Sequence, residues 1–311
     1  MVVRRSFVDL VGCRLPIQSA SLGGPIATPA LAAAVSEAGG LGMIANPSSA
    51  AEVRQVVDSA RTLTGQPIGV GFLIPFVVTE AVQAAAASVE VVEFFYGNPD
   101  PDLIRLAKVR GAIVGWQTGS AAEALVAVEC GCDYVVAQGI EAGGHVRGRQ
   151  RLDELLAETL SHVDVPVVAA GGIGTAERAA RLLRDGAAAI RIGTRFVAAV
   201  EADAHPTYVE LLIAATREDT VLTEVFGTDW PDARHRVLRT CVDAAAAFEG
   251  GVVALSGDRD IPPFASTPPT RDSEGEITAM ALYAGESVDA VTRALPASEI
   301  VAELTRIPAV D

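Results

Sequence analysis

Short apolar segments rich in Val and Ile alternate with Ala-rich stretches of helical spacing from residue 16 to residue 193. This alternation is typical of βα units, in which a helix connects one parallel strand to the next. Eight apolar segments are present, so the sequence predicts eight strands. They are residues 16–20, 41–45, 68–73, 89–94, 112–117, 134–138, 165–170 and 188–193.

The helices between these segments carry start signals. A polar residue that can accept a hydrogen bond from a free N–H group precedes several of them, and two such residues open a capping box with a glutamate. The predicted first-turn positions are Thr28 before Pro29, Ser49 with Glu52, Thr79 before Glu80, Asn98 before Pro99, Ser120 with Glu123, and Thr175 before Ala176.

Eight βα units with short connections favour a closed (β/α)8 TIM barrel. An open doubly wound sheet would more often carry a GxGxxG turn after its first strand, and none follows residues 16–20. We therefore expect an α/β protein in which residues 1–204 form the barrel. Residues 205–311 are expected to form a smaller, mainly helical C-terminal extension and lid that partly completes the barrel. Its predicted helices are residues 208–216, 234–248, 278–284, 287–295 and 297–304.

The charge balance excludes several classes of function. A formal net charge of −15, with lysine nearly absent, repels nucleic acids and anionic membrane surfaces. No apolar run reaches the ~18 residues that span a bilayer, and Asp9 interrupts the N-terminal segment where a signal peptide would be apolar. The cysteines and histidines lack the spacing of a metal site. We expect a cytoplasmic protein that binds no metal and acts on a small molecule.

Two glycine-rich loops follow the seventh and eighth predicted strands. They contain Ala170-Gly171-Gly172 and Gly193-Thr194. In this type of barrel these two loops commonly hold a phosphate, because glycine lets backbone N–H groups approach an anion closely. The Thr194 hydroxyl can add a donor. Glycines after strands also simply make turns, but two such loops at these positions favour phosphate.

One histidine is singled out by its surroundings. His145 follows Gly143-Gly144 in the loop after the sixth strand, so it should point into the mouth of the same barrel. An imidazole titrates near neutral pH, which suits it to proton transfer. Gln138, at the end of that strand, can bind a polar ring edge. Glu141 could orient His145 or cap the next helix, and capping is favoured.

The other histidines, His162, His205 and His235, lack partner spacing and are expected to be structural or solvated. Four apolar side chains at strand ends are candidates for the substrate pocket, with barrel core as the alternative for the second and fourth. They are Leu22, Phe72, Ile74 and Trp116.

These motifs resemble the nitronate monooxygenase family, formerly called 2-nitropropane dioxygenases. The resemblance spans almost the whole chain, and the run Gln138 to His145 is its most specific part. The other matching pieces are residues 16–18, 28–42, 169–173 and 192–196, and a late motif at residues 283–286.

The resemblance implies an FMN-dependent TIM barrel with His145 as the catalytic base. The family oxidises nitronates or nitroalkanes with molecular oxygen to carbonyl compounds and nitrite. The residues that the resemblance, together with the loops above, assigns to FMN are Ala20, Ser21, Gln117, Gln138, Gly143, Gly144, Ala170, Gly171, Gly172, Gly193 and Thr194.

Two other functions stay open at this point. The Glu141 to His145 run also resembles the FMN-dependent enoyl-acyl-carrier-protein reductases, which use NAD(P)H. An acidic carrier protein would be repelled by a chain of charge −15, so a small free substrate is favoured. The third possibility is a protein that binds FMN without turnover. The oligomeric state is open, with a homodimer as one option.

Overall fold

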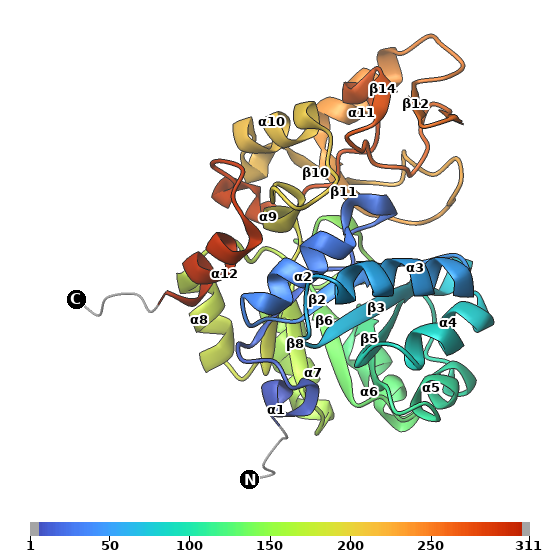
Figure 1. Cartoon of the computed structure of the whole chain (residues 1–311). Coiled ribbons are helices and arrows are strands. Elements are labelled where there is room, and N and C mark those ends of the chain that lie inside the picture. The colour runs from blue at the N-terminus through green and yellow to red at the C-terminus, as the bar shows by residue number, and fades with distance from the viewer. Residues whose placement is uncertain (1–5, 307–311) are drawn as a thin grey trace.

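The computed structural model describes residues 6–306, and its centre is an eight-stranded parallel sheet surrounded by helices (Figure 1). The eight strands lie where the sequence predicts them, so the barrel prediction is confirmed. Their order around the sheet is β1-β9-β8-β6-β5-β4-β3-β2. Their bounds are β1 (Ile17–Ser19), β2 (Gly42–Ala45), β3 (Ile68–Leu73), β4 (Val91–Phe95), β5 (Ile113–Thr118), β6 (Tyr134–Gln138), β8 (Val167–Ala170) and β9 (Ala189–Ile192).

Strand β1 closes the barrel. It pairs with β9 along its length, and a single parallel bridge joins Gln18 to Leu41 at the start of β2. The Ser19 N–H donates to the Leu41 carbonyl at 3.0 Å, and the Leu41 N–H donates to the Ile17 carbonyl at 2.8 Å. The carboxyl ends of all eight parallel strands therefore surround one opening of the barrel, which we call the mouth.

Side chains alternate between the inside of the barrel and the helix layer, as a strand period of two requires. Val91, Tyr134, Val136 and Ala189 belong to one buried apolar cluster with Phe7 and Met43, whereas Val92 and Val135 belong to the larger cluster under the helices. Phe7, on α1 (Phe7–Val11), makes an edge-to-face contact with Tyr134 at 5.4 Å between ring centroids. Helix α1 therefore covers the end of the barrel opposite the mouth (Figure 1).

Most predicted helix starts are confirmed, and two are wrong by one or two residues. Thr28, Ser49, Ser120 and Thr175 each accept a hydrogen bond from a first-turn N–H group. Thr79 is instead the first residue of α4, and Asp100, not Asn98, caps α5, because its carboxylate accepts from two N–H groups. The barrel helices are α2 (Pro29–Glu37), α3 (Ala50–Arg61), α4 (Thr79–Ala86), α5 (Pro101–Lys108), α6 (Ala121–Glu129), α7 (Leu152–His162), α8 (Ala176–Arg184) and α9 (Thr194–Val197).

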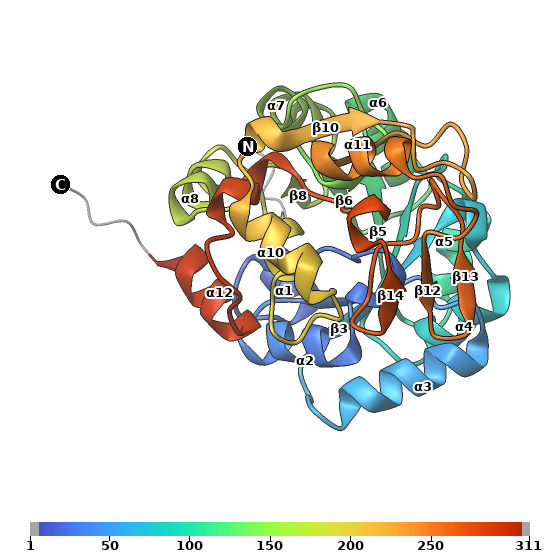
Figure 2. The ribbon, with the colours of Figure 1, turned by 90° about the horizontal axis from the view of Figure 1, so that it is seen from above.

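The C-terminal extension lies over the mouth of the barrel (Figure 2). It contains two small three-stranded sheets that the sequence analysis did not predict. One of them includes β7, which belongs to the barrel loop after β6. The bounds are β7 (Gly144–His145), α10 (Pro206–Ala214), β10 (Thr220–Thr223), β11 (His235–Leu238), α11 (Arg239–Ala247), β12 (Ala254–Ser256), β13 (Arg259–Ile261), β14 (Ser273–Gly275) and α12 (Ala297–Thr305).

Three predicted helices of the extension are wrong in part. The predicted helix 234–248 is divided into β11 and α11, because residues 235–238 pair with β10 and β7. The predicted helices 278–284 and 287–295 are only the short 3-10 helices Ile277–Ala279 and Glu286–Ala290. Between them, Tyr283 makes an antiparallel bridge to Val237. Tertiary pairing therefore overrides the helical spacing in these segments.

The last helix packs on the barrel rather than over its mouth. Helix α12 contacts α2 and α8, so it occupies the gap between the last and first helices of the outer ring (Figure 1). Within residues 6–306 no helix is long and apolar enough to cross a membrane.

Strand β2 approaches the backbone of helix α2 closely at Gly42, and this contact can be tested. A Cβ atom added there would lie 1.9 Å from the Ala32 carbonyl oxygen. We expect Gly42→Ala to destabilise the protein by about 3 kcal/mol, because backbone cannot move aside cheaply. In thermal melts this should lower the Tm by at least ~5 °C.

Gly65→Ala is the matched control, because a Cβ atom there meets nothing within 4 Å. It should change stability by less than ~0.5 kcal/mol. Equal Tm values for the two variants would contradict the proposed contact.

Candidate active site

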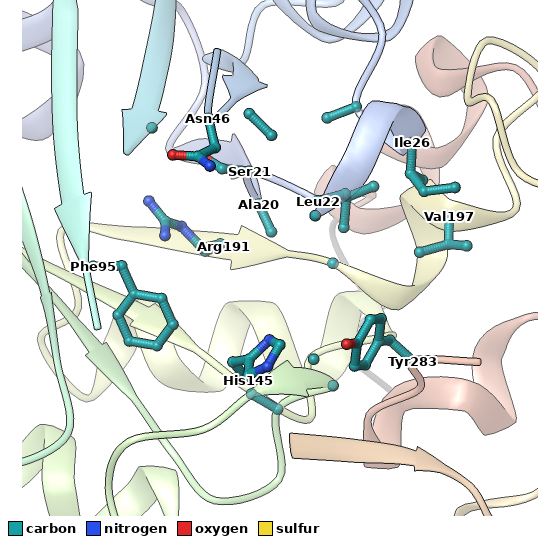
Figure 3. A pocket seen from close by; sticks show the side chains of 18 of the residues that line it. Ala20, Ser21, Leu22, Ile26, Asn46, Phe95, His145, Arg191, Val197 and Tyr283 are labelled. Carbon is teal, nitrogen blue, oxygen red and sulfur yellow. The ribbon is translucent and has the colours of Figure 1, made fainter. Parts of the chain in front are cut away.

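A cavity of about 560 Å³ opens at the carboxyl ends of the barrel strands (Figure 3). Its volume is in the range of small-molecule and cofactor sites. All of the predicted site residues line it, although they come from the ends of five strands and the loops that follow them. They are Ala20, Ser21, Gln117, Gln138, Gly143, Gly144, His145, Ala170, Gly171, Gly172, Gly193 and Thr194. Of the four apolar candidates, Leu22 and Phe72 also line the cavity. Ile74 does not line it, and Trp116 is fully buried in the larger cluster under the helices.

One end of the cavity is formed by the two predicted phosphate loops. Gly171 and Gly172 have φ angles of +111° and +64°, a conformation that side chains other than glycine rarely adopt. The Thr194 hydroxyl accepts a hydrogen bond from the Gly285 N–H at 3.0 Å, which leaves its own hydrogen free to donate. The extension therefore adjoins these loops, and its Ser287 lines the same end.

Glycine is also required where the extension meets the loop before His145. A Cβ atom on Gly143 would lie 2.4 Å from the Gly285 nitrogen. A Cβ atom on Gly144 would meet nothing within 4 Å, so the backbone at this point faces open space. The Gly143-Gly144 pair thus brings two backbones together and leaves room in front of His145.

Three buried polar atoms in the cavity wall lack a hydrogen-bond partner. They are Ser21 Oγ, Gln138 Oε1 and His145 Nε2. The Gln138 amide donates to the His145 backbone carbonyl at 2.9 Å, which holds the amide oxygen toward the cavity. Because unpaired buried polar atoms are costly, these atoms are expected to contact a bound polar group.

His145 lies inside a ring of aromatic side chains. Strand β7 pairs His145 with His235 of β11, and the two ring centroids are 5.3 Å apart. The Trp230 ring stacks on the imidazole at 3.9 Å with an interplanar angle of 26°. Tyr96 and Tyr283 lie 5.7 Å and 5.5 Å away.

This environment changes the acid–base chemistry of His145. Burial, and after it the nearby His235, lowers the pKa of the imidazole from 6.5 to about 3. No carboxylate contacts the ring to stabilise a positive charge among the interactions of residues 6–306. His145 is therefore neutral at physiological pH, and its buried Nε2 can accept or donate one hydrogen bond according to the tautomer.

Glu141 is a helix cap, as the sequence analysis favoured. Both of its carboxylate oxygens accept from the Leu152 N–H at the start of α7, at 3.2 and 3.0 Å. His162 is exposed, and His205 caps α10 by accepting from the Thr207 N–H at 3.1 Å. The prediction that they are structural or solvated is confirmed.

The comparisons with known proteins agree with this geometry. The family model described as nitronate monooxygenase matches residues 4–79 and 74–306. The chain belongs to the nitronate monooxygenase family. The resemblance predicted from the sequence is confirmed, and the chain is accordingly an enzyme of the oxidoreductase type, in a family whose members use a flavin.

Individual members and neighbours of the nitronate monooxygenase family cover nearly all of the chain. A nitronate monooxygenase of Pseudomonas aeruginosa is 30% identical over 96% of this chain and 97% of its own length. The structure of FabK from Thermotoga maritima is 31% identical with a TM-score of 0.80, and covers 96% of this chain and 94% of its own. A nitroalkane oxidase from Streptomyces ansochromogenes is 29% identical with a TM-score of 0.77, covering 96% of each chain.

The sequence analysis of this family member missed several residues of the cavity. Arg191 and Glu93 line its floor and form a buried ion pair. Strand alternation could have found them, since Val91 and Ala189 point into the barrel and so must residues 93 and 191. Trp230 and His235 do not line the cavity but pack against His145 from behind its wall. His235 is buried and hydrogen-bonded to the backbone at Phe226 and Ala233, so it is structural, as expected, but no local signal places it or Trp230 beside His145.

Because the pKa of His145 is lowered in the folded protein, the stability of the protein should depend on pH. Above pH 6.5 the imidazole is neutral in both the folded and the unfolded chain. Between pH 6.5 and about 3 only the unfolded chain takes up the proton, so the free energy of unfolding falls as the pH falls. Glutamine does not titrate, so we expect the free energy of unfolding of His145→Gln to fall by roughly 1–2 kcal/mol less than that of the wild type between pH 7.5 and pH 5.

Thermal melts at pH 7.5 and pH 5 measure the effect. The control is His162→Gln at an exposed position, which should keep the wild-type difference in Tm between the two pH values. A His145→Gln variant that loses as much stability on acidification as the wild type would contradict a buried neutral imidazole.

Proposed function

We propose that this chain is an FMN-dependent oxidoreductase that oxidises nitronates, and more slowly nitroalkanes, with molecular oxygen to carbonyl compounds and nitrite. The observation that carries the proposal is the unpartnered Nε2 atom of a neutral His145 in the same cavity as Ser21 Oγ, Gln138 Oε1 and two glycine loops. Membership in the nitronate monooxygenase family supports the same chemistry.

The residues present fit FMN. The left-handed glycines Gly171 and Gly172, with Gly193 and the Thr194 hydroxyl, would hold the phosphate through N–H and O–H donors without a lysine. Ser21, Gln117 and Gln138 would contact the polar edge of the ring. A bound FMN would supply the two-electron chemistry, taking electrons from the substrate and passing them to oxygen.

His145 would then bind and orient the substrate. A neutral imidazole with a pKa of about 3 is a weak base, so it removes a proton from carbon less readily than an ordinary histidine. A nitronate already lacks that proton and needs only a hydrogen bond from the ring. The aromatic wall of Trp230, Tyr96 and Tyr283 keeps water away from the imidazole. This is why we favour nitronates over nitroalkanes.

The second candidate is an NAD(P)H-dependent enoyl thioester reductase. The Glu141 to His145 run resembles those enzymes, and the likeness to FabK over almost the whole chain is compatible with it. The two functions differ in the electron donor. Cytoplasmic location and a homodimer stay predictions.

The phosphate site can be tested at Thr194. We expect Thr194→Val to weaken FMN binding at least ~10-fold, because a hydrogen bond to a charged group contributes about 1.5–3 kcal/mol. Riboflavin has no phosphate, so its affinity should be unchanged. Both constants can be measured by quenching of flavin fluorescence.

Thr194→Ser keeps the hydroxyl and is the control, with FMN affinity close to that of the wild type. Equal losses for FMN and riboflavin would place the phosphate elsewhere. A wild-type protein that is colourless and does not take up FMN would overturn the proposed function.

The role of His145 can be tested with paired substrates. We expect His145→Ala to retain FMN and to lose at least ~10²-fold in kcat/KM for a nitroalkane, whose proton must be removed. The loss for propionate 3-nitronate should be at least ~10-fold smaller. Oxygen consumption measures both rates.

Anaerobic mixing with NADH or NADPH discriminates the second candidate. The proposed enzyme should keep its oxidised flavin spectrum on the time scale of turnover. Fast bleaching by a nicotinamide, together with no oxygen consumption on nitronate, would favour the reductase.

A further inference from the structure

One positively charged side chain, that of Arg191, lines the cavity. Among the residues of the described chain that line it, Arg191 is the only lysine or arginine. Its side chain is 4% exposed, and it forms an ion pair with Glu93, which is 3% exposed. In Figure 3 Arg191 extends from its strand toward the side of the cavity where Phe95 and Asn46 lie.

The ion pair spans the centre of the barrel. Arg191 is on β9 and Glu93 is on β4, and these strands are four places apart in the order of an eight-stranded closed sheet. They therefore lie on opposite sides of the barrel axis. The guanidinium group must therefore be near that axis, at the floor of the cavity.

A set of polar side chains holds this position, and we call it the polar floor: Gln18, Glu93, Gln117, Tyr134 and Arg191. Arg191 donates through Nε to Gln18 Oε1 at 3.3 Å, through Nη1 to Gln117 Oε1 and through Nη2 to Glu93 Oε2. Glu93 Oε2 also accepts from the Tyr134 hydroxyl at 2.8 Å and from the Gln18 amide at 3.2 Å.

Burying the charged and polar side chains of the polar floor inside the barrel costs desolvation free energy. Layers of branched apolar side chains normally occupy this space, and a buried ion pair is often no more stable than the apolar side chains that could replace it. Both members of the pair also line the cavity, so packing alone does not account for their position. Because the Gln117 oxygen accepts from Arg191, its amide N–H groups are left for the cavity.

Reduced flavin carries a negative charge on its pyrimidine part, and charges near the ring set its electronic properties. We infer that Arg191 is the group that stabilises the reduced flavin, both by its charge and by orienting the Gln117 amide, and that Glu93 is the counter-charge that limits this effect. The inference rests on the proposed binding of FMN.

The experiment compares Glu93→Gln, Arg191→Gln and the double variant with the wild type, each as the FMN-loaded protein. Sulfite is the probe, since it adds to the flavin and leaves the ring with the negative charge of the reduced form. We expect Glu93→Gln to tighten sulfite binding about 10-fold and Arg191→Gln to weaken it about 10-fold, with the double variant within about threefold of the wild type.

The midpoint potential of the bound flavin should move in parallel. A 10-fold change in the ratio of the affinities for reduced and oxidised flavin is about 30 mV for a two-electron couple. Glu93→Gln should therefore be about 30 mV more positive than the wild type and Arg191→Gln about 30 mV more negative. Arg191→Lys, which keeps the charge, should recover part of the loss.

The control is Arg61→Gln. Arg61 forms an ion pair with Glu90 at 2.8 Å outside the cavity, so sulfite affinity should not change. If Arg191→Gln does not fold because Glu93 is left unpaired, Glu93→Gln and the double variant still carry the test.

The experiment distinguishes failure of this inference from failure of the proposed function. Variants that bind FMN with sulfite affinities within twofold of one another would overturn the inference and leave the proposed function intact. A purely structural role would weaken FMN binding in every variant without the opposite changes in sulfite affinity. Failure of the wild type to bind FMN would instead overturn the proposed function.

Discussion

The hydrogen bonds between β1 and its two neighbours are the constraint on which the rest of the structure depends. With β1 bonded to β9 on one side and bridged to Leu41 on the other, the sheet closes, and every loop that follows a strand reaches the same mouth. Glycines as far apart in the chain as Gly143 and Gly193 can therefore line one cavity. In an open sheet the loops after β1 and β9 would be at one edge and those after β2 and β3 at the other.

The C-terminal extension supplies the side chains that surround His145 on the side away from the barrel. The pairing of β7 with β11 places His235 beside His145, and the same loop of the extension brings Trp230 onto the imidazole. The contact between Gly143 and Gly285 and the hydrogen bond from Gly285 to Thr194 attach the extension to both ends of the cavity. His145 and the glycine loops after β8 and β9 are thereby held by a common set of contacts.

In the cavity the buried ion pair of Arg191 and Glu93 lies apart from His145. The aromatic ring around His145 excludes charge and lowers the pKa of the imidazole, whereas the charged pair of Arg191 and Glu93 lies at the floor among hydrogen-bonding partners. His145 is a neutral hydrogen-bonding group, and the charge of Arg191 is balanced by Glu93. Such a site is suited to an oxidoreductase, in which electrons are transferred.

The sequence by itself determined the eight strands, the two glycine loops and the place of His145, because these depend on local periodicity and on residues next to one another in the chain. The alternation of side chains along β4 and β9 also turns Glu93 and Arg191 inward. Only the tertiary structure decided that the segments 235–238 and 280–285 are extended rather than helical, that Trp230 and His235 surround His145, and that Arg191 meets Glu93. Each of these depends on contacts between residues distant in sequence, whose energies exceed the small local preferences that a sequence pattern records.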